Sequence, residues 1–355
     1  MSHIDVRLPT SGITATMGGP MKASTETRLK PQDLHWLREP VVQHCGTYDQ
    51  VADAIPFFDR RAFALNTTPS AEGERPRVTG ENAYYDEVIQ LHEDQEQIVP
   101  VGIVSKSYKL IQHRYLFESA VRALDGADVP LSKVSVFMTM TRFGGRMALR
   151  FVLPKEFGFD PGDSHPLRLR LECFNSVDGS TRLDFLMSWY RLICSNGLAM
   201  RATLAHETMI HTERSVVPNI RAIITAGIES IAEEREYFRL EIGTRVDDAA
   251  FRVWIDGELK KRWGALAAAR TYLICQTGFD GVFSDPFDKQ PPSQKSMRRT
   301  ERVPGAPPKA ENAYAVEQAL AWIARQRLDI QEQLQYVREI PPLMQKLNRP
   351  GSLRM

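Results

Sequence analysis

The 355-residue sequence holds four cysteines, and no two of them form a C-x-x-C pair. The spacing of Cys45, Cys173, Cys194 and Cys275 matches neither a zinc-binding motif nor the disulfide framework of a small secreted protein. The N-terminus also lacks the apolar core of a signal peptide. These absences predict a cytoplasmic protein, in which Cys173 and Cys194, both within predicted strands, are small buried apolar residues.

Long apolar runs and excess charge are also missing. No run approaches the roughly 20 residues that a membrane-spanning helix needs, so no membrane partner is predicted. The net charge is only +1, because 45 Lys and Arg residues nearly balance 44 Asp and Glu residues. Nucleic-acid binding through bulk positive charge is therefore excluded, and any such function needs a local basic patch.

The sequence also lacks metal-binding and catalytic motifs. Residues 81–97 contain six acidic side chains and no Lys or Arg, but no metal-ligand spacing, so we expect a solvated face. His206 and His211 are five residues apart, whereas one helix face requires three or four. Cys194 has no histidine partner that would activate it. We therefore predict no metal, no cofactor and no catalytic residue.

What the sequence does contain is an alternation of apolar and polar residues between 134 and 194. It predicts a β-hairpin over 134–153 that turns at Gly144-Gly145, a third strand from Leu167, and a fourth from Leu183 to Cys194. The sequence Val-Asp-Gly-Ser at 177–180 forms the second turn. Consecutive short strands of this kind predict an antiparallel meander with one apolar and one polar face.

Helices surround this meander in the predicted α+β fold. We expect a strand or a strand pair within 101–111. Helices are predicted over 113–124, 198–212, 218–242, 246–276 and 312–338, with interruptions near Gly257 and Gly264 and an end at Pro341-Pro342. Ile220, Ile224, Gly227, Ile231 and Phe238 recur at nearly heptad spacing. That stripe suits packing within the chain, which we favour, or a homo-oligomer contact.

The same patterns divide the chain into three parts. Residues 1–30 read as a flexible arm and residues 31–212 as an α+β core with a central antiparallel sheet. Residues 213–355 form a helical extension with a Pro-rich loop at 277–310. Between 289 and 309 this loop has six positive residues, Arg298 and Arg299 among them, and one negative residue. It is either a phosphate-binding segment or a solvated linker.

Arginines gather on the predicted polar face of the meander. They are Arg146, Arg150, Arg168 and Arg170. Guanidinium groups bind phosphate oxygens bidentately, and Phe137 or Tyr190 would offer bases a stacking surface. The alternative is that these arginines solvate one side of the sheet and pair with Glu172 and Asp184.

Two motifs at the strand ends resemble a known family. The segment Asn-Ser-x-Asp-Gly-Ser at 175–180 and the segment Arg-x-x-Cys-Ser-Asn at 191–196 resemble phage- and plasmid-borne proteins catalogued as domain of unknown function 932. A third element, at Asn312, Ala313, Tyr314 and Glu317, is a weaker match. The resemblance covers residues 100–324 and implies a mobile element as context, with no established activity. The motifs supply a possible ligand loop, made of Asn175, Ser176, Asp178, Gly179, Ser180, Arg191 and Asn196.

The order of helix, β-meander and further helices is similar to that of single-strand annealing proteins of phage recombination. Those proteins hold single-stranded DNA in a basic groove and assemble into rings or filaments. The sequence therefore predicts a nucleic-acid-binding protein, most readily of single-stranded DNA in recombination, annealing or replication, although fold alone does not fix function. The alternatives are a protein-binding module that uses the acidic segment and an enzyme centred on the Asn175–Ser180 loop.

Overall fold

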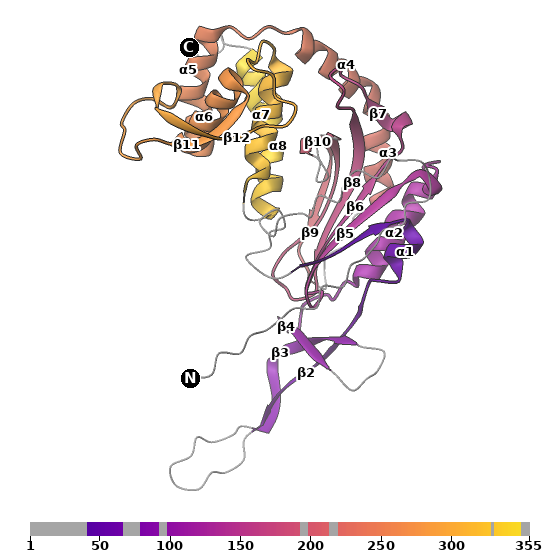
Figure 1. Cartoon of the computed structure of the whole chain (residues 1–355). Coiled ribbons are helices and arrows are strands. Elements are labelled where there is room, and N and C mark those ends of the chain that lie inside the picture. Colours follow the sequence, from indigo (N-terminus) through magenta and orange to yellow (C-terminus); the bar gives the residue numbers. More distant parts are fainter. Residues whose placement is uncertain are drawn as a thin grey trace, which may run out of the picture.

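The computed structural model describes residues 41–66, 79–91, 98–191, 198–212, 219–327 and 330–348, with an α+β fold built on antiparallel sheets (Figure 1). The predicted arm at 1–30, Cys194 and Asn196 lie outside these ranges. No helix of the described ranges combines the length and apolar character needed to cross a membrane.

A seven-stranded antiparallel sheet lies at the centre of the fold. Its main path runs through β1 (Val41–Gly46), β5 (Ser135–Thr141), β6 (Arg146–Val152), β8 (Leu167–Ser176), β9 (Leu183–Arg191) and β10 (Leu198–Met209), and β7 (Gly158–Phe159) pairs with β8. The meander predicted over 134–194 is therefore confirmed as β5, β6, β8 and β9. Gly144 and Gly179 both have positive φ, at 70° and 78°, which glycine adopts without a steric penalty in the two tight turns.

One predicted helix is wrong. Residues 198–212 are mainly the strand β10, which pairs antiparallel with β9. The segment contains several good helix formers, including three alanines and two methionines between 198 and 209. Local propensity is a weak guide when an adjacent strand supplies a ladder of backbone hydrogen bonds.

The apolar face of the central sheet packs against helices α1 (Tyr48–Ala52), α2 (His113–Asp125) and α3 (Ile220–Glu229). The single helix predicted over 218–242 is instead α3 followed by α4 (Ile231–Gly243), with Ser230 between them. The near-heptad stripe is buried inside this chain, as the preferred interpretation expected. A Cβ atom at Gly227 would lie 2.6 Å from Met187 Cγ, so only glycine lets α3 approach β9 this closely.

The other face of the sheet is partly covered by the last helix. The predicted helix over 312–338 is two helices, α7 (Ala313–Arg325) and α8 (Ile330–Asn348), and α8 continues through Pro341 and Pro342. Leu334 of α8 packs against Phe174 and Leu186 of the sheet. Ile340, Leu343 and Met344 are at most 1% exposed, and this burial outweighs the backbone hydrogen bonds that the two prolines remove.

A second sheet projects beyond the central one (Figure 1). It consists of β2 (Phe57–Asn66), β3 (Thr79–Leu91) and β4 (Val99–Ser105), in that order. The strand predicted within 101–111 thus ends at Ser105. Strand β3 carries the first part of the acidic run, where Asp86 is buried against Arg60 of β2 at 3.1 Å.

The C-terminal helices carry a β-hairpin. Helix α5 (Asp248–Trp254), a π-helical turn (Ile255–Leu259) and α6 (Lys260–Thr277) include the predicted irregularities, and Gly264 has a φ of 85°. The loop predicted over 277–310 is wrong in part, because β11 (Phe279–Phe283) and β12 (Met297–Arg302) pair antiparallel within it. The basic segment is consequently held in a defined place beside α6.

Candidate nucleic-acid interface

Three of the four meander arginines have carboxylate partners. Arg146 Nε lies 3.3 Å from the Asp178 carboxylate. The Glu172 carboxylate forms ion pairs with Arg170 Nη2 at 2.6 Å and with Arg150 Nε at 3.5 Å. Burial by itself raises the pKa of Glu172, but Arg170, Arg150 and a hydrogen bond from Ser188 outweigh it and lower the pKa overall. The carboxylate therefore stays ionised. The two carboxylates offset two of the three arginine charges, and Arg150 is the one arginine of the three that remains partly exposed.

Tyr190, one of the two aromatic residues expected to stack with bases, is not accessible. Tyr190 is 5% exposed, and the Arg170 guanidinium lies over its ring, 4.4 Å from the centroid. Asp184, the other expected arginine partner, instead accepts Arg338 of α8 at 3.4 Å. Arg168 and Phe137 are half-buried. The alternative interpretation of the sequence, in which the arginines of the polar face pair with nearby carboxylates, therefore describes this side of the sheet better than an open arginine face does.

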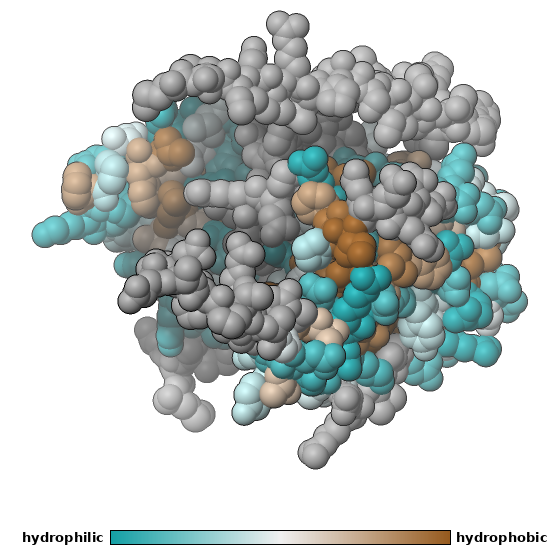
Figure 2. All heavy atoms as spheres, turned by 90° about the horizontal axis from the view of Figure 1, so that it is seen from below, coloured by the Kyte–Doolittle hydropathy of each residue, from teal (hydrophilic) through white to brown (hydrophobic). Residues whose placement is uncertain are grey.

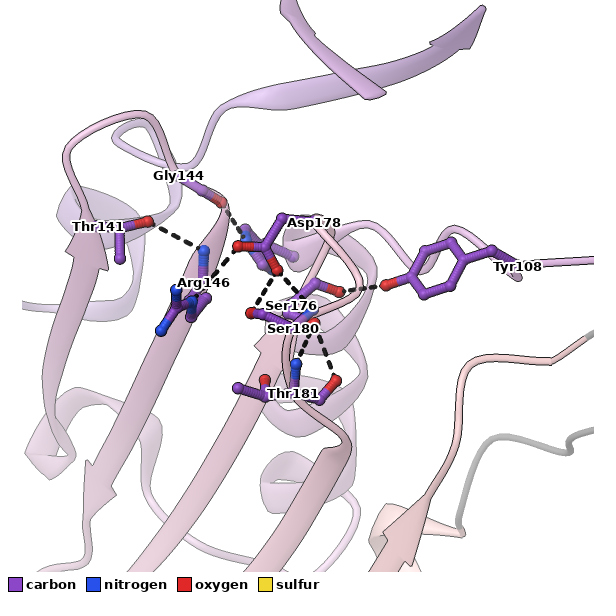
Figure 3. Close-up of polar contacts among 9 residues, drawn as sticks. Tyr108, Thr141, Gly144, Arg146, Ser176, Asp178, Ser180 and Thr181 are labelled. Carbon is purple, nitrogen blue, oxygen red and sulfur yellow. Dashed lines mark hydrogen bonds and ion pairs between the residues drawn. The ribbon is translucent and has the colours of Figure 1, made fainter. Parts of the chain in front are cut away.

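The Asn175–Ser180 loop forms a compact polar network (Figure 3). The Asp178 carboxylate accepts hydrogen bonds from Ser180 N at 2.9 Å and Ser180 Oγ at 2.5 Å, besides its ion pair with Arg146. The Ser176 hydroxyl donates to Thr181 O at 2.9 Å, and Tyr108 donates from its hydroxyl to Ser176 O at 2.9 Å. These contacts fix the turn between β8 and β9.

His113 joins this turn to the β5–β6 turn. Its Nε2 lies 2.7 Å from Gly144 O, and Asn175 Nδ2 lies 2.9 Å from its Nδ1. The carbonyl can only accept and the amide nitrogen can only donate, so the imidazole is neutral with its proton on Nε2. Burial lowers the pKa of His113 to about 4. Sequence reasoning missed this residue, which is 62 positions from Asn175 and belongs to no motif.

The two motifs do not form one site. Arg191 pairs in register with Leu167 at the start of β8, whereas Asn175 lies eight residues further along the same strand. At 3.3 Å per residue the separation along the sheet is about 26 Å. The predicted cluster of Asn175, Asp178 and Arg191 is therefore wrong. Arg191 is fully buried and pairs with Asp163, in the loop before β8.

A group of exposed cations lies on the β11–β12 hairpin. Along β12, Arg298, Arg299 and Arg302 are all exposed. Arg299 and Arg302 lie over the Phe279 ring at 5.3 and 5.7 Å, and Lys295 lies over Phe283 at 5.0 Å. Within the described residues none of these four side chains has a carboxylate within ion-pair distance. In the connection between the strands, Phe287 is 89% exposed.

Buried polar contacts fix the hairpin to the helices. Asp280 of β11 accepts Arg270 Nε of α6 at 2.8 Å and Trp322 Nε1 of α7 at 2.8 Å. Burial raises the pKa of Asp280, but these bonds more than offset the effect and hold it below its ordinary value. At the far end, Ser293 donates from its backbone and hydroxyl to Asp256 at 2.8 and 2.6 Å.

Comparison with known proteins identifies no relative of this chain. No protein-family model matches the chain, and searches of curated proteins and of solved structures give no match either. Among the described residues, no group of three or more His, Cys, Asp or Glu side chains is arranged to hold a metal ion. The function is therefore inferred from the chain's own side chains.

Proposed function

We propose that the protein binds single-stranded nucleic acid, DNA foremost, through the β11–β12 hairpin, in the recombination, annealing or replication of a mobile element. The observation that carries the proposal is a fixed hairpin whose exposed cations have no carboxylate partner among the described residues, together with one almost fully exposed aromatic ring. Arg298, Arg299 and Arg302 supply phosphate contacts, and Phe287 supplies a surface on which a base can stack.

The meander arginines have a different function in this proposal. Arg146 and Arg170 are buried, and each already has a carboxylate partner. A phosphate would have to displace a carboxylate from a site with little access to solvent, which costs more than neutralising an exposed cation. They hold the sheet together, and the hairpin presents the exposed charge.

The test is fluorescence anisotropy of a labelled single-stranded oligonucleotide at several salt concentrations, with duplex as a comparison. We expect Arg298→Gln/Arg299→Gln to weaken binding and to reduce the slope of log K against log salt by about 1.4, since each lost phosphate contact on a single strand contributes about 0.7. Phe287→Ala removes a stacking contact and costs about 1–3 kcal/mol with an unchanged slope.

A charge-matched control is Lys106→Gln/Lys155→Gln. Both lysines are exposed and lie outside the hairpin, so this variant changes the net charge equally. Binding that responds to both double variants alike would mean that bulk charge attracts the strand. No binding to the unmodified protein at low salt would end the proposal.

The three-stranded sheet supports a second candidate function, protein binding. Strand β4 is an edge strand in the described part of this sheet, and its Ile103 is 56% exposed. Tyr84 of β3 is 76% exposed. Figure 2, which views the molecule from this end, shows hydrophobic side chains at the surface beside hydrophilic ones. An open edge with apolar side chains can accept a strand from a partner. Ile103→Asp should abolish cross-linking to such a partner and leave oligonucleotide binding unchanged.

A further inference from the structure

A pocket of about 460 Å³ lies at the junction between the sheet and the C-terminal helices, away from the Asn175 network. Its walls come from the loop before β8, the end of α4, the segment after β12 and the first turns of α7. The volume is within the range of small-molecule sites, roughly 300–1,000 Å³. Three stretches of the chain, residues 161–165, Ile242 and residues 302–318, thus line one open pocket.

The pocket wall combines an apolar and a polar part. Pro161, Ile242 and Pro307 supply apolar surface. His165 and Arg302 bring groups that can carry positive charge, and the N-terminus of α7, capped by Asn312, adds a helix dipole of the same sign. A few polar groups that converge on an apolar wall are the usual composition of a small-molecule site.

Two polar side chains of the pocket wall, Tyr314 and Gln318, are buried and interact with each other. Tyr314 is 4% and Gln318 is 6% exposed, and both line the pocket. Burial raises the pKa of Tyr314, and its contact with the Gln318 side chain offsets only part of this effect, so the phenol keeps its proton. The two groups do not meet with good hydrogen-bond geometry. A ligand with polar atoms can therefore bond to both more favourably than they bond to each other.

Arg191 neutralises the carboxylate of the pocket wall. It continues the row of inward side chains on β9 and is fully buried. Its guanidinium pairs with Asp163 and lies 5.7 Å from the centre of the Tyr314 ring. A Cβ atom at Gly305 would lie 3.3 Å from Arg191 Nη1, and Gly305 has a φ of 72°. The one carboxylate of the pocket wall is thereby neutralised, and the remaining charge is positive.

We propose that this pocket binds a small organic anion, a phosphate monoester or a carboxylate, whose charged end contacts Arg302 and His165. Its apolar body packs against Pro161 and Ile242, and its polar atoms bond to Tyr314 and Gln318. A cation is disfavoured because Asp163 is already paired with Arg191. A purely apolar ligand would bring the buried polar groups no better hydrogen-bond partner.

The test is isothermal titration calorimetry of the full chain with two anions and their neutral counterparts. Adenosine 5′-monophosphate is compared with adenosine, and benzoate with benzamide, so that the phosphate and carboxylate alternatives are separated. We expect one anion to bind at least tenfold more tightly than its neutral counterpart. Arg302→Gln, a change at an exposed side chain, should weaken that anion about tenfold.

Ala315→Leu adds bulk to the pocket wall and should abolish binding, with circular dichroism and thermal melting as checks that the variant folds. Arg298→Gln, on the hairpin but not on the pocket wall, should leave the anion's affinity unchanged. Failure of both anions to bind, or equal binding of the neutral compounds, would overturn the proposal. A different outcome would also overturn the proposal: the anion no longer binds to Arg298→Gln but still binds fully to Ala315→Leu and Arg302→Gln. The anion would then be bound on the hairpin.

Discussion

At the scale of single residues, Glu172 determines what its neighbours can do. Its carboxylate forms ion pairs with Arg150 and Arg170 and accepts a hydrogen bond from the Ser188 hydroxyl at 2.6 Å. The alternation of the sequence correctly places Arg150 and Arg170 on the polar face of the sheet. The alternation offers Glu172 as a partner for both but does not settle whether they pair with it or face a ligand, because that depends on the cross-strand register of β6, β8 and β9 and on what covers the face.

Glu172→Ala is expected to destabilise the protein by about 3–5 kcal/mol, because it leaves buried guanidinium groups without a partner. Urea unfolding measures the change. The control is Glu118→Ala, where a half-exposed carboxylate on α2 pairs with Arg114 at 3.3 Å and the expected cost is about 0.5 kcal/mol. Equal costs for the two variants would contradict the structural assignment of Glu172.

His113 makes the stability of the protein depend on pH. Its pKa is about 4 in the folded protein, against 6.5 for a histidine exposed to water, so the unfolded chain binds the extra proton between these values. Stability contributed by the neutral imidazole is therefore complete above pH 6.5 and declines as the pH falls toward 4. With about 1.4 kcal/mol per pKa unit, the loss is on the order of 3 kcal/mol.

His113→Gln should remove this contribution. The variant is expected to be less stable than the unmodified protein at pH 7.5, because the bonds to Gly144 and Asn175 are altered. Its free energy of unfolding should fall less between pH 6.5 and pH 5. Chemical denaturation at several pH values measures both curves, and parallel curves would show that other groups, such as His211, account for the dependence.

At the scale of elements, the sequence predicts the parts whose signal is local. The meander strands, their glycine turns and helix α2 follow from alternation, turn residues and helical periodicity. Strand β10 and the β11–β12 hairpin were missed, because each is stabilised by pairing and packing that local composition does not encode. The break at Ser230 and the continuation of α8 through its prolines likewise depend on tertiary packing.

The contact between α3 and β9 gives a sharp test at this scale. Gly227→Val places side-chain atoms where Met187 lies and is expected to destabilise the protein by about 1–3 kcal/mol through overpacking. Gly243→Ala is the matched control, since a Cβ atom there meets nothing within 4 Å. Thermal unfolding should show a lower midpoint for the first variant and little change for the second. A neutral Gly227→Val would mean that α3 is not packed this closely.

At the scale of the whole molecule, both proposed sites depend on how the C-terminal helices meet the sheet. Arg191, Arg302 and Tyr314 lie on three separate elements, and Arg302 belongs to both the hairpin and the pocket wall. The basic composition of residues 289–309 leaves two interpretations open from the sequence alone, a phosphate-binding segment and a solvated linker. The sequence marks Arg302 as part of the basic segment and Asn312 as part of the third motif element, but it does not predict the pocket, because only the folded chain brings these residues together with His165 and Ile242.

Asp280 connects these parts, since it lies on the hairpin and bonds to both α6 and α7. Asp280→Asn weakens the attachment without removing any cation from the hairpin. Charge alone predicts tighter oligonucleotide binding, because a negative charge is lost. We expect weaker binding, by a few-fold, because the hairpin is no longer held in place, with an unchanged salt slope because the number of phosphate contacts is the same.

Glu301→Gln is the control for that comparison, because it removes the same charge from an exposed position on β12 and should strengthen binding. Anisotropy titrations of both variants, at the same salt concentrations, separate position from charge. Two variants that bind equally tightly would show that a placed hairpin is not required. Opposite changes in affinity at equal salt slopes would show that the fold presents the cations, and that the attachment to α6 and α7 is part of the binding site.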